Sequence, residues 1–320
     1  MGKIKKLKGG FQLFVTEDEK LLVTSSSRNS VYVYDLETLK LRLQTKTVSN
    51  VSKNAISSDK KLLAAKNTQG HIAIISMETG EEILRCNMKW CEGEQMTFTS
   101  DGKALLDFDW DGRTMLLDCE KNRCMILDGP EECNVKVLPR VAHMQYDRNS
   151  NQIYKFVADE WGNSKGRIMA SPANQENIIY EVIQEFPGML PDHLKGISLC
   201  KIHNYYVDMN NKELIMTDKN FVEEKRISLP TQVVESKVSL KKIWVSPCEQ
   251  YVYVDMGRQY DPDDFAGTFH DAKSLSYLFE MDTMELVQEF DFDYVSDFTM
   301  IDADKRFIIS TWQGTYIGEV

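Results

Sequence analysis

The chain has 320 residues, of which 42% are hydrophobic and 27% are charged, so it can bury a substantial core beneath a well-solvated surface. Aromatic residues reach 10%, a share that excludes a disordered, low-complexity chain. The 38 basic and 49 acidic side chains give a formal net charge of −11. Nucleic-acid binders normally carry a basic face, so this charge argues against nucleic acid as the main ligand.

The first residues and the cysteines favour a cytoplasmic protein. Positive charge near the start is not followed by an apolar stretch, so we expect no signal peptide. Apolar runs such as 72–75 fall far short of the roughly 18 residues of a membrane span. The pairs Cys86/Cys91 and Cys119/Cys124 lack a common zinc spacing. We therefore expect reduced thiols, a cytoplasmic location, and no metal or other cofactor.

A repeat opens the chain. The polar segment Thr16-Glu-Asp-Glu-Lys20 leads into the apolar segment 21–24, and the same pattern returns at 58–65 and 100–106 in steps of 41 and 42 residues. Self-similarity at such a period is the signature of a repeat architecture. Each copy predicts a polar turn that feeds a short strand.

A second strand with a shared ending follows each of these turns, and a third strand follows it. The alternation of apolar and polar residues and the many β-branched and aromatic side chains predict strands, and long helical periodicity is absent. The second strands and their endings read Val31-Tyr-Val-Tyr-Asp-Leu-Glu-Thr38, Ile72-Ala-Ile-Ile-Ser-Met-Glu-Thr79, Met115-Leu-Leu-Asp-Cys-Glu-Lys121 and Tyr277-Leu-Phe-Glu-Met-Asp-Thr283; the third strands are expected at 39–43, 82–85, 123–126 and 286–290.

Later copies are degenerate but recognisable. The seventh copy lacks a fourth strand, and the segment 3–7, which precedes the first inner strand 10–15, can supply it. Such closure would remove exposed strand edges. Strands are expected at 152–158, 166–171 and 178–183 in the fourth copy and at 197–202, 205–209, 213–217 and 224–229 in the fifth; the sixth opens at 243–250, and the seventh opens at 298–305 and ends at 315–320.

These segments resemble WD40 and YVTN-like β-propeller repeats. The place of the Trp-Asp pair of WD40 proteins is taken by Tyr34-Asp35, Ile75-Ser76 and Leu117-Asp118, whereas the Gly-His pair is missing. The resemblance is therefore to the propeller superfamily as a whole. It implies an all-β fold in which residues 1–320 form a single seven-bladed β-propeller of four-stranded antiparallel blades, with six or eight blades as the alternatives.

In this superfamily, one face usually binds the partner or ligand. That face is built from the loops between strands two and three and from the connections between blades. Two copies have long insertions there, at 159–166 and 257–274. Trp110 and Trp312 occupy equivalent positions, and Trp161 lies in the corresponding loop of the fourth copy. Aromatic rings at a rim are typical interface anchors, although each ring can instead cover its own blade.

Acidic residues gather at the ends of the second strands. We expect them to form an acidic mouth for a basic peptide, a cationic group or a sugar, and the alternative is ordinary solvation of strand ends. Arg258 can clamp a carboxylate or pair with Asp261 or Asp263. The acids are Asp107, Asp109, Asp111, Asp159, Glu160, Asp208 and Asp255.

Enzymatic motifs are absent from the sequence. None of the five histidines lies in a Gly-x-Ser-x-Gly or His-Glu-x-x-His context. His270, beside Asp271 in a long insertion, is the one histidine for which an acid–base role can be imagined. We therefore predict no catalytic residue.

The sequence favours a non-catalytic scaffold that binds a protein or peptide of basic character through its loop face, without nucleic acid or membrane as partner. The alternatives are a propeller enzyme (a lyase or hydrolase), a carbohydrate or small-ligand binder with an acidic mouth, or a structural subunit that makes contact through its edge. The candidate binding residues are Trp110, Trp161, Trp312, Arg258, Tyr260, Asp109, Asp159, Asp255 and His270.

Overall fold

The described part of the chain is built from strands. It contains 28 of them, arranged as seven four-stranded antiparallel sheets, which confirms the predicted all-β, seven-bladed propeller. The computed structural model describes residues 4–26, 28–87, 93–109, 113–128, 140–147, 150–158, 165–173, 178–187, 198–208, 211–219, 222–230, 238–258, 275–292 and 295–320.

Contacts group the chain into two compact units, and the prediction that residues 1–320 form one domain stays a prediction. The unit Lys8–Leu194 holds blades 1 to 4. Blade 1 is β2 (Leu13–Val15), β3 (Leu21–Ser25), β4 (Ser30–Asp35) and β5 (Leu41–Lys46); blade 2 is β6 (Val51–Ile56), β7 (Leu62–Asn67), β8 (His71–Ser76) and β9 (Glu82–Asn87). Blade 3 is β10 (Gly93–Phe98), β11 (Ala104–Asp109), β12 (Thr114–Asp118) and β13 (Arg123–Asp128); blade 4 is β14 (Arg140–Asp147), β15 (Gln152–Ala158), β16 (Lys165–Pro172) and β17 (Glu181–Pro187).

The other unit combines Met1–Leu7 with Lys195–Val320 and holds blades 5 to 7. Blade 5 is β18 (Ser198–Leu199), β19 (Asn204–Asp208), β20 (Glu213–Thr217) and β21 (Glu223–Ser228); blade 6 is β22 (Val238–Val245), β23 (Tyr251–Arg258), β24 (Leu275–Glu280) and β25 (Glu285–Phe290). Blade 7 is β26 (Val295–Ile301), β27 (Arg306–Thr311), β28 (Gly314–Glu319) and β1 (Lys5–Leu7).

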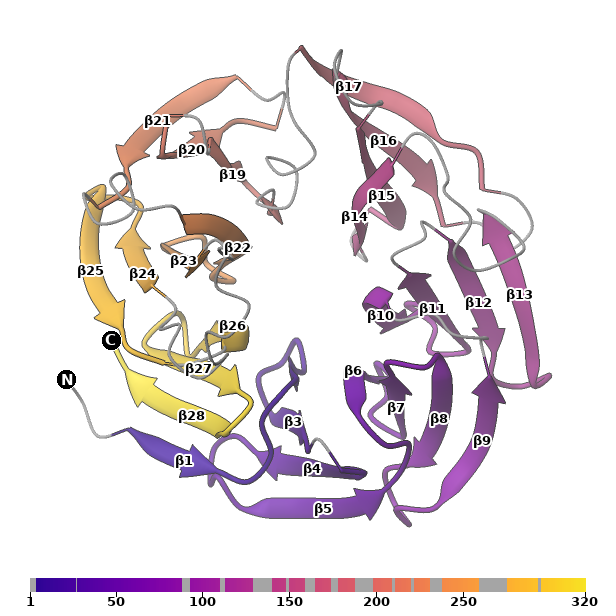
Figure 1. Cartoon of the computed structure of the whole chain (residues 1–320). Helices are drawn as coiled ribbons and strands as arrows, with labels where there is room; N and C mark the ends of the chain where they lie inside the picture. Colours follow the sequence, from indigo (N-terminus) through magenta and orange to yellow (C-terminus); the bar gives the residue numbers. More distant parts are fainter. Residues whose placement is uncertain are drawn as a thin grey trace, which may run out of the picture. The chain divides into compact units, whose positions relative to one another are not determined.

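Strand β1 completes blade 7, as predicted. It runs antiparallel to β28, where Lys5 lies opposite Ile317 and Leu7 lies opposite Thr315 (Figure 1). The side chain of Leu7 is buried, whereas Lys5 and Lys6 are exposed on the outermost strand of the blade. The basic segment is therefore the solvent-facing part of an edge strand.

The polar turns of the sequence repeat owe their recurrence to local hydrogen bonds. In blade 2 the Ser57 hydroxyl donates to Asp59 (2.7 Å) and accepts the Leu62 N–H (3.0 Å), and Asp59 accepts the Lys61 N–H (3.0 Å). Such side-chain bonds to the backbone fix a tight turn between the first and second strands. The same bonds are made by Thr16 with Asp18 in blade 1 and by Thr99 with Asp101 in blade 3.

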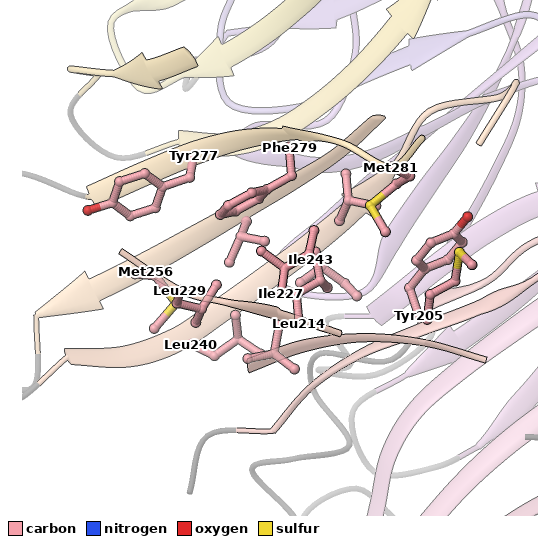
Figure 2. Close-up of a cluster of buried hydrophobic side chains, with 14 residues drawn as sticks. Tyr205, Leu214, Ile227, Leu229, Leu240, Ile243, Met256, Tyr277, Phe279 and Met281 are labelled. Carbon is pink, nitrogen blue, oxygen red and sulfur yellow. The ribbon is translucent and has the colours of Figure 1, made fainter. Parts of the chain in front are cut away.

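Buried apolar side chains join neighbouring blades. In blades 5 and 6, a cluster combines Leu214 and Ile227 with Ile243 and Phe279 (Figure 2). A second cluster joins blades 2 and 3, where Ile72 and Ile74 pack with residues that include Leu117. Because each blade packs against the next in this way, the central strands carry apolar residues on both faces.

The outer strand of blade 4 differs from its expected bounds. It was expected at 178–183 but runs from Glu181 to Pro187. Ile178 and Tyr180 instead pack against the cluster between blades 3 and 4, and the Lys155 ammonium lies 4.5 Å from the centre of the Tyr180 ring. Their apolar character therefore serves packing between blades.

Candidate functional site

In blades 1 and 2, the turn between the second and third strands lies beside the connection to the next blade. The Thr47 N–H donates to the Asn29 carbonyl (2.8 Å), and the Asn50 N–H donates to the Arg28 carbonyl (3.2 Å). The Thr68 N–H in turn donates to the Asn50 carbonyl (3.3 Å). We call the surface built by these two kinds of segment the turn face of a blade. Backbone hydrogen bonds thus hold the two kinds of segment together.

Trp312 is the predicted binding residue that the structure describes most fully. It lies in a two-residue turn of blade 7, between the paired residues Thr311 and Gly314. The Thr311 hydroxyl accepts the Gln313 N–H (3.1 Å) and donates to the Gly314 carbonyl (3.2 Å), which fixes the turn. The Trp312 side chain is 65% exposed. A large aromatic ring is thus held in solvent at the tip of a rigid hairpin.

The turn of blade 2 is one residue longer, spanning 68–70, and a side chain fixes it as well. The Asn67 side chain accepts the N–H groups of Gln69 (2.9 Å) and His71 (2.8 Å), so it plays the part that Thr311 plays in blade 7. Thr68 follows Asn67 in the chain as Trp312 follows Thr311. A tryptophan at the tip is thus not common to the turns of blades 2 and 7.

Most of the other predicted binding residues lie outside the described residues. Asp109 and Arg258 are the last residues of β11 and β23, and their side chains are outside the description as well. Their roles stay predictions. The residues concerned, beside these two, are Trp110, Trp161, Tyr260, Asp159 and His270.

Two of the expected mouth acids lie in the interior. Asp255, on β23, is fully buried and accepts a hydrogen bond from the Ser276 hydroxyl (2.9 Å). Asp107, on β11, is buried against the Lys66 ammonium of β7 at 2.6 Å. Burial raises the pKa of Asp107, and the positive charge of Lys66 opposes that rise. Neither carboxylate offers solvent-accessible surface to a partner, because both are enclosed between strands.

A cavity of about 160 Å³ opens between blades 3 and 4 on the side opposite the turn face. It is lined in part by Thr99, Asp101, Leu116 and Asn151. Sites for drug-sized ligands usually enclose roughly 300–1,000 Å³. This cavity is therefore too small to favour the small-ligand alternative.

A buried carboxylate that the sequence did not point to joins blades 5 and 6. Glu249 accepts the N–H groups of Ile202 (2.6 Å) and His203 (2.9 Å), and it lies 3.1 Å from Nδ1 of His203. Glu224 lies 3.4 Å from the other ring nitrogen of His203. Burial raises the pKa of Tyr205, whose hydroxyl is 3.4 Å from Glu249. Through these two bonds, Glu249 of blade 6 holds the backbone of blade 5. The bonded residues are 47 and 46 positions apart in the sequence, so no local motif indicates the contact.

Within the part of the chain that the structure describes, no group of three or more His, Cys, Asp or Glu side chains is arranged to hold a metal ion. Among the same residues, no helix is found that is long and apolar enough to cross a membrane.

Comparisons with known proteins support the fold. The structure is similar to the β-propeller domain of Cps50 (Swd1) from Myceliophteria thermophila, with a TM-score of 0.71 and 10% sequence identity over 99% of this chain and 98% of that chain. No protein-family model and no curated protein matches the sequence. At 10% identity the similarity shows the fold alone, so any inference about function depends on the residues of this chain.

Proposed function

From the premise that this chain is a seven-bladed β-propeller with the WD40-like fold, we propose that it is a non-catalytic scaffold that binds a protein or peptide through its turn faces. The observation that carries the proposal is the exposed ring of Trp312 at the tip of a hairpin that hydrogen bonds of Thr311 hold in place. A tryptophan contributes a large apolar contact area to an interface, and tryptophan is enriched among the residues that dominate binding energy.

The charge of the chain bears on the chemistry of the partner. With a formal net charge of −11, the scaffold attracts partners of basic character and repels nucleic acid. Binding should therefore weaken as salt is raised, because exposed charges are screened over about 8–10 Å at 0.10–0.15 M salt. A cytoplasmic location belongs to the same proposal, and cell fractionation tests it.

The experiment compares the wild-type chain with Trp312→Ala and with Ile179→Ala, a matched control that removes another exposed apolar side chain, 72% exposed, from the connection between the third and fourth strands of blade 4. Proteins retained by the wild type from a native lysate are identified by mass spectrometry, and the affinity of the main one is measured by calorimetry. We expect Trp312→Ala to weaken binding about 10- to 30-fold and Ile179→Ala to leave it unchanged.

Two results would count against the scaffold. Equal affinities for all three chains would remove Trp312 from the interface. Conversely, a chain that retains no protein but hydrolyses or cleaves a carbohydrate would favour the enzyme alternative, in which Asp109, Asp159 and His270 are the groups to replace first.

A further inference from the structure

The outer strands of blades 2 and 3 bring two cysteines together. Cys86 lies on β9, where it pairs with Ile72, and Cys124 lies on β13, where it pairs with Leu117. Ile72 and Leu117 belong to the apolar cluster that joins the two blades, and Cys86 packs against that cluster. Paired residues of neighbouring strands point to the same face of a sheet, so Cys86 shares the face of Ile72 and Cys124 shares the face of Leu117, and both side chains lie toward the boundary between blades. The two thiols interact with each other there. Both are thiols in the structure.

Electrostatics favour Cys86 as the reactive member of this pair. The hydrogen bond from Cys124 lowers the pKa of Cys86 to about 7, against the opposing effects of partial burial and of the charge on Asp107. The same hydrogen bond raises the pKa of Cys124. Cys124 is exposed and Cys86 is half-buried, so a small oxidant can reach both. A thiolate, not a thiol, is the form that reacts with peroxide.

Two other described cysteines have the opposite character. Burial raises the pKa of Cys119 to about 11 and that of Cys200 to about 12. Both thiols are protonated at neutral pH and are poor nucleophiles. Cys119 and Cys200 therefore serve as unreactive reference thiols for Cys86 within the same chain.

We propose that Cys86 and Cys124 form a redox-reversible disulfide that links the outer strands of blades 2 and 3 when the oxidant is hydrogen peroxide. The Cys86 thiolate attacks one peroxide oxygen, the O–O bond breaks, and hydroxide leaves, which gives a sulfenic acid at Cys86. Cys124 then attacks that sulfur; the S–S bond forms, the S–O bond breaks, and the departing oxygen takes the Cys124 proton and leaves as water. Two electrons pass from the two sulfurs to peroxide, and a dithiol reductant returns them.

The disulfide should also change the stability of the protein. It would close a loop from residue 86 to residue 124, which restricts the unfolded chain. For a chain of 320 residues that unfolds as one unit, this predicts an increase in Tm of about 5 °C, which dithiothreitol should reverse.

The test treats the purified, reduced chain with hydrogen peroxide, alkylates the remaining thiols, and maps linked peptides by mass spectrometry. The expected product is a Cys86–Cys124 link, formed at a rate that is half-maximal near pH 7 and levels off above about pH 8. In Cys124→Ser, a dimedone adduct should accumulate on Cys86, because the sulfenic acid has lost its partner. Cys248→Ser, which replaces another exposed cysteine, is the matched control and should oxidise like the wild type.

Several outcomes would overturn the proposal. One is a link from Cys86 to another cysteine, such as Cys91. Another is oxidation of Cys86 to sulfinic acid in the wild type without any link to Cys124. Peptide mapping of the wild type decides between these outcomes and the expected one, so the proposal stays testable even if a serine variant folds poorly.

Discussion

Replacing Lys66 by methionine should be among the most damaging single changes in the described core. Lys66 on β7 and Asp107 on β11 form an ion pair with 2.6 Å between Nζ and Oδ2, and their side chains are 0% and 1% exposed. Lys66→Met leaves the carboxylate of Asp107 without its main partner. Breaking a buried pair in this way destabilises proteins by about 3–5 kcal/mol. For 320 residues that unfold together, this corresponds to a fall in Tm of about 4–8 °C.

The loss of stability caused by Lys66→Met should depend on pH in a defined direction. Burial raises the pKa of Asp107, and Lys66 and Lys53 are the positive charges that oppose the rise. Without Lys66, the pKa in the folded protein lies still further above its unfolded value of about 3.9. A group of this kind favours the folded state at low pH and loses that contribution as pH rises through the folded pKa. The effect of Lys66→Met should therefore be smaller at pH 5 than at pH 8.

The assay is calorimetric unfolding of the variants at both pH values. Two controls frame the result. Lys66→Met/Asp107→Leu, which replaces both charges by apolar groups, should unfold within about 1–2 kcal/mol of the wild type. Lys121→Met, which removes one partner of the exposed Lys121–Asp118 pair, should change stability by less than about 1 kcal/mol. The reasoning fails if the double variant loses the sum of its two single changes, because the two charges would then act independently.

Three further predictions concern the turns and the last blade. Asp59→Asn should destabilise at pH 7 and approach the wild type near pH 2 in urea titrations. Hydrogen bonds from the Ser57 hydroxyl and a backbone N–H lower the pKa of Asp59, so their stabilisation is complete above about pH 4 and is lost as pH falls through the pKa of the folded protein. Gly318→Ala places a methyl group 2.6 Å from Phe307 and should cost about 1–3 kcal/mol in thermal unfolding, part of which a second change, Phe307→Leu, should restore. Deletion of residues 1–7 uncovers the edge of β28 and should produce oligomers visible by light scattering; a deleted chain that stays monomeric would contradict the role of β1 as an edge cover.

The sequence was informative where the interactions are local. The turn of Ser57 and Asp59 holds itself together by bonds within a few residues, so its pattern repeats visibly along the chain. Two strands of the degenerate copies were predicted to the residue: 152–158 and 213–217 coincide with β15 and β20. The pairing of β1 with β28 joins distant residues, but it was predicted as well, because the last copy lacked a strand and the first residues offered one.

Contacts between blades were beyond sequence reasoning. The repeat step from blade 2 to blade 3 is 42 residues, whereas Lys66 and Asp107 are 41 residues apart. The two residues therefore occupy neighbouring positions on their strands and their side chains point to opposite faces, which lets Lys66 meet Asp107 across the boundary between blades. Asp107 was assigned to a solvent-facing mouth because its burial depends on the neighbouring blade. The contact of His203 with Glu249 joins residues 46 positions apart, and the apolar run at 178–180 resembles a strand until its packing partners are known.

The pairing of β1 with β28 has a consequence for the time course of synthesis. Strand β1 leaves the ribosome before its partner exists, and at about 5–20 residues per second a chain of 320 residues takes roughly 15–65 s to make. Through that interval β1 has to stay soluble and unpaired next to other nascent chains. Lysine on an edge strand discourages wrong pairing, so Lys5 and Lys6 are well suited to protect β1 while it waits. The two lysines that lie on the surface of the complete blade 7 would thus act earlier as well, by preventing β1 from pairing with other chains before β28 is synthesised.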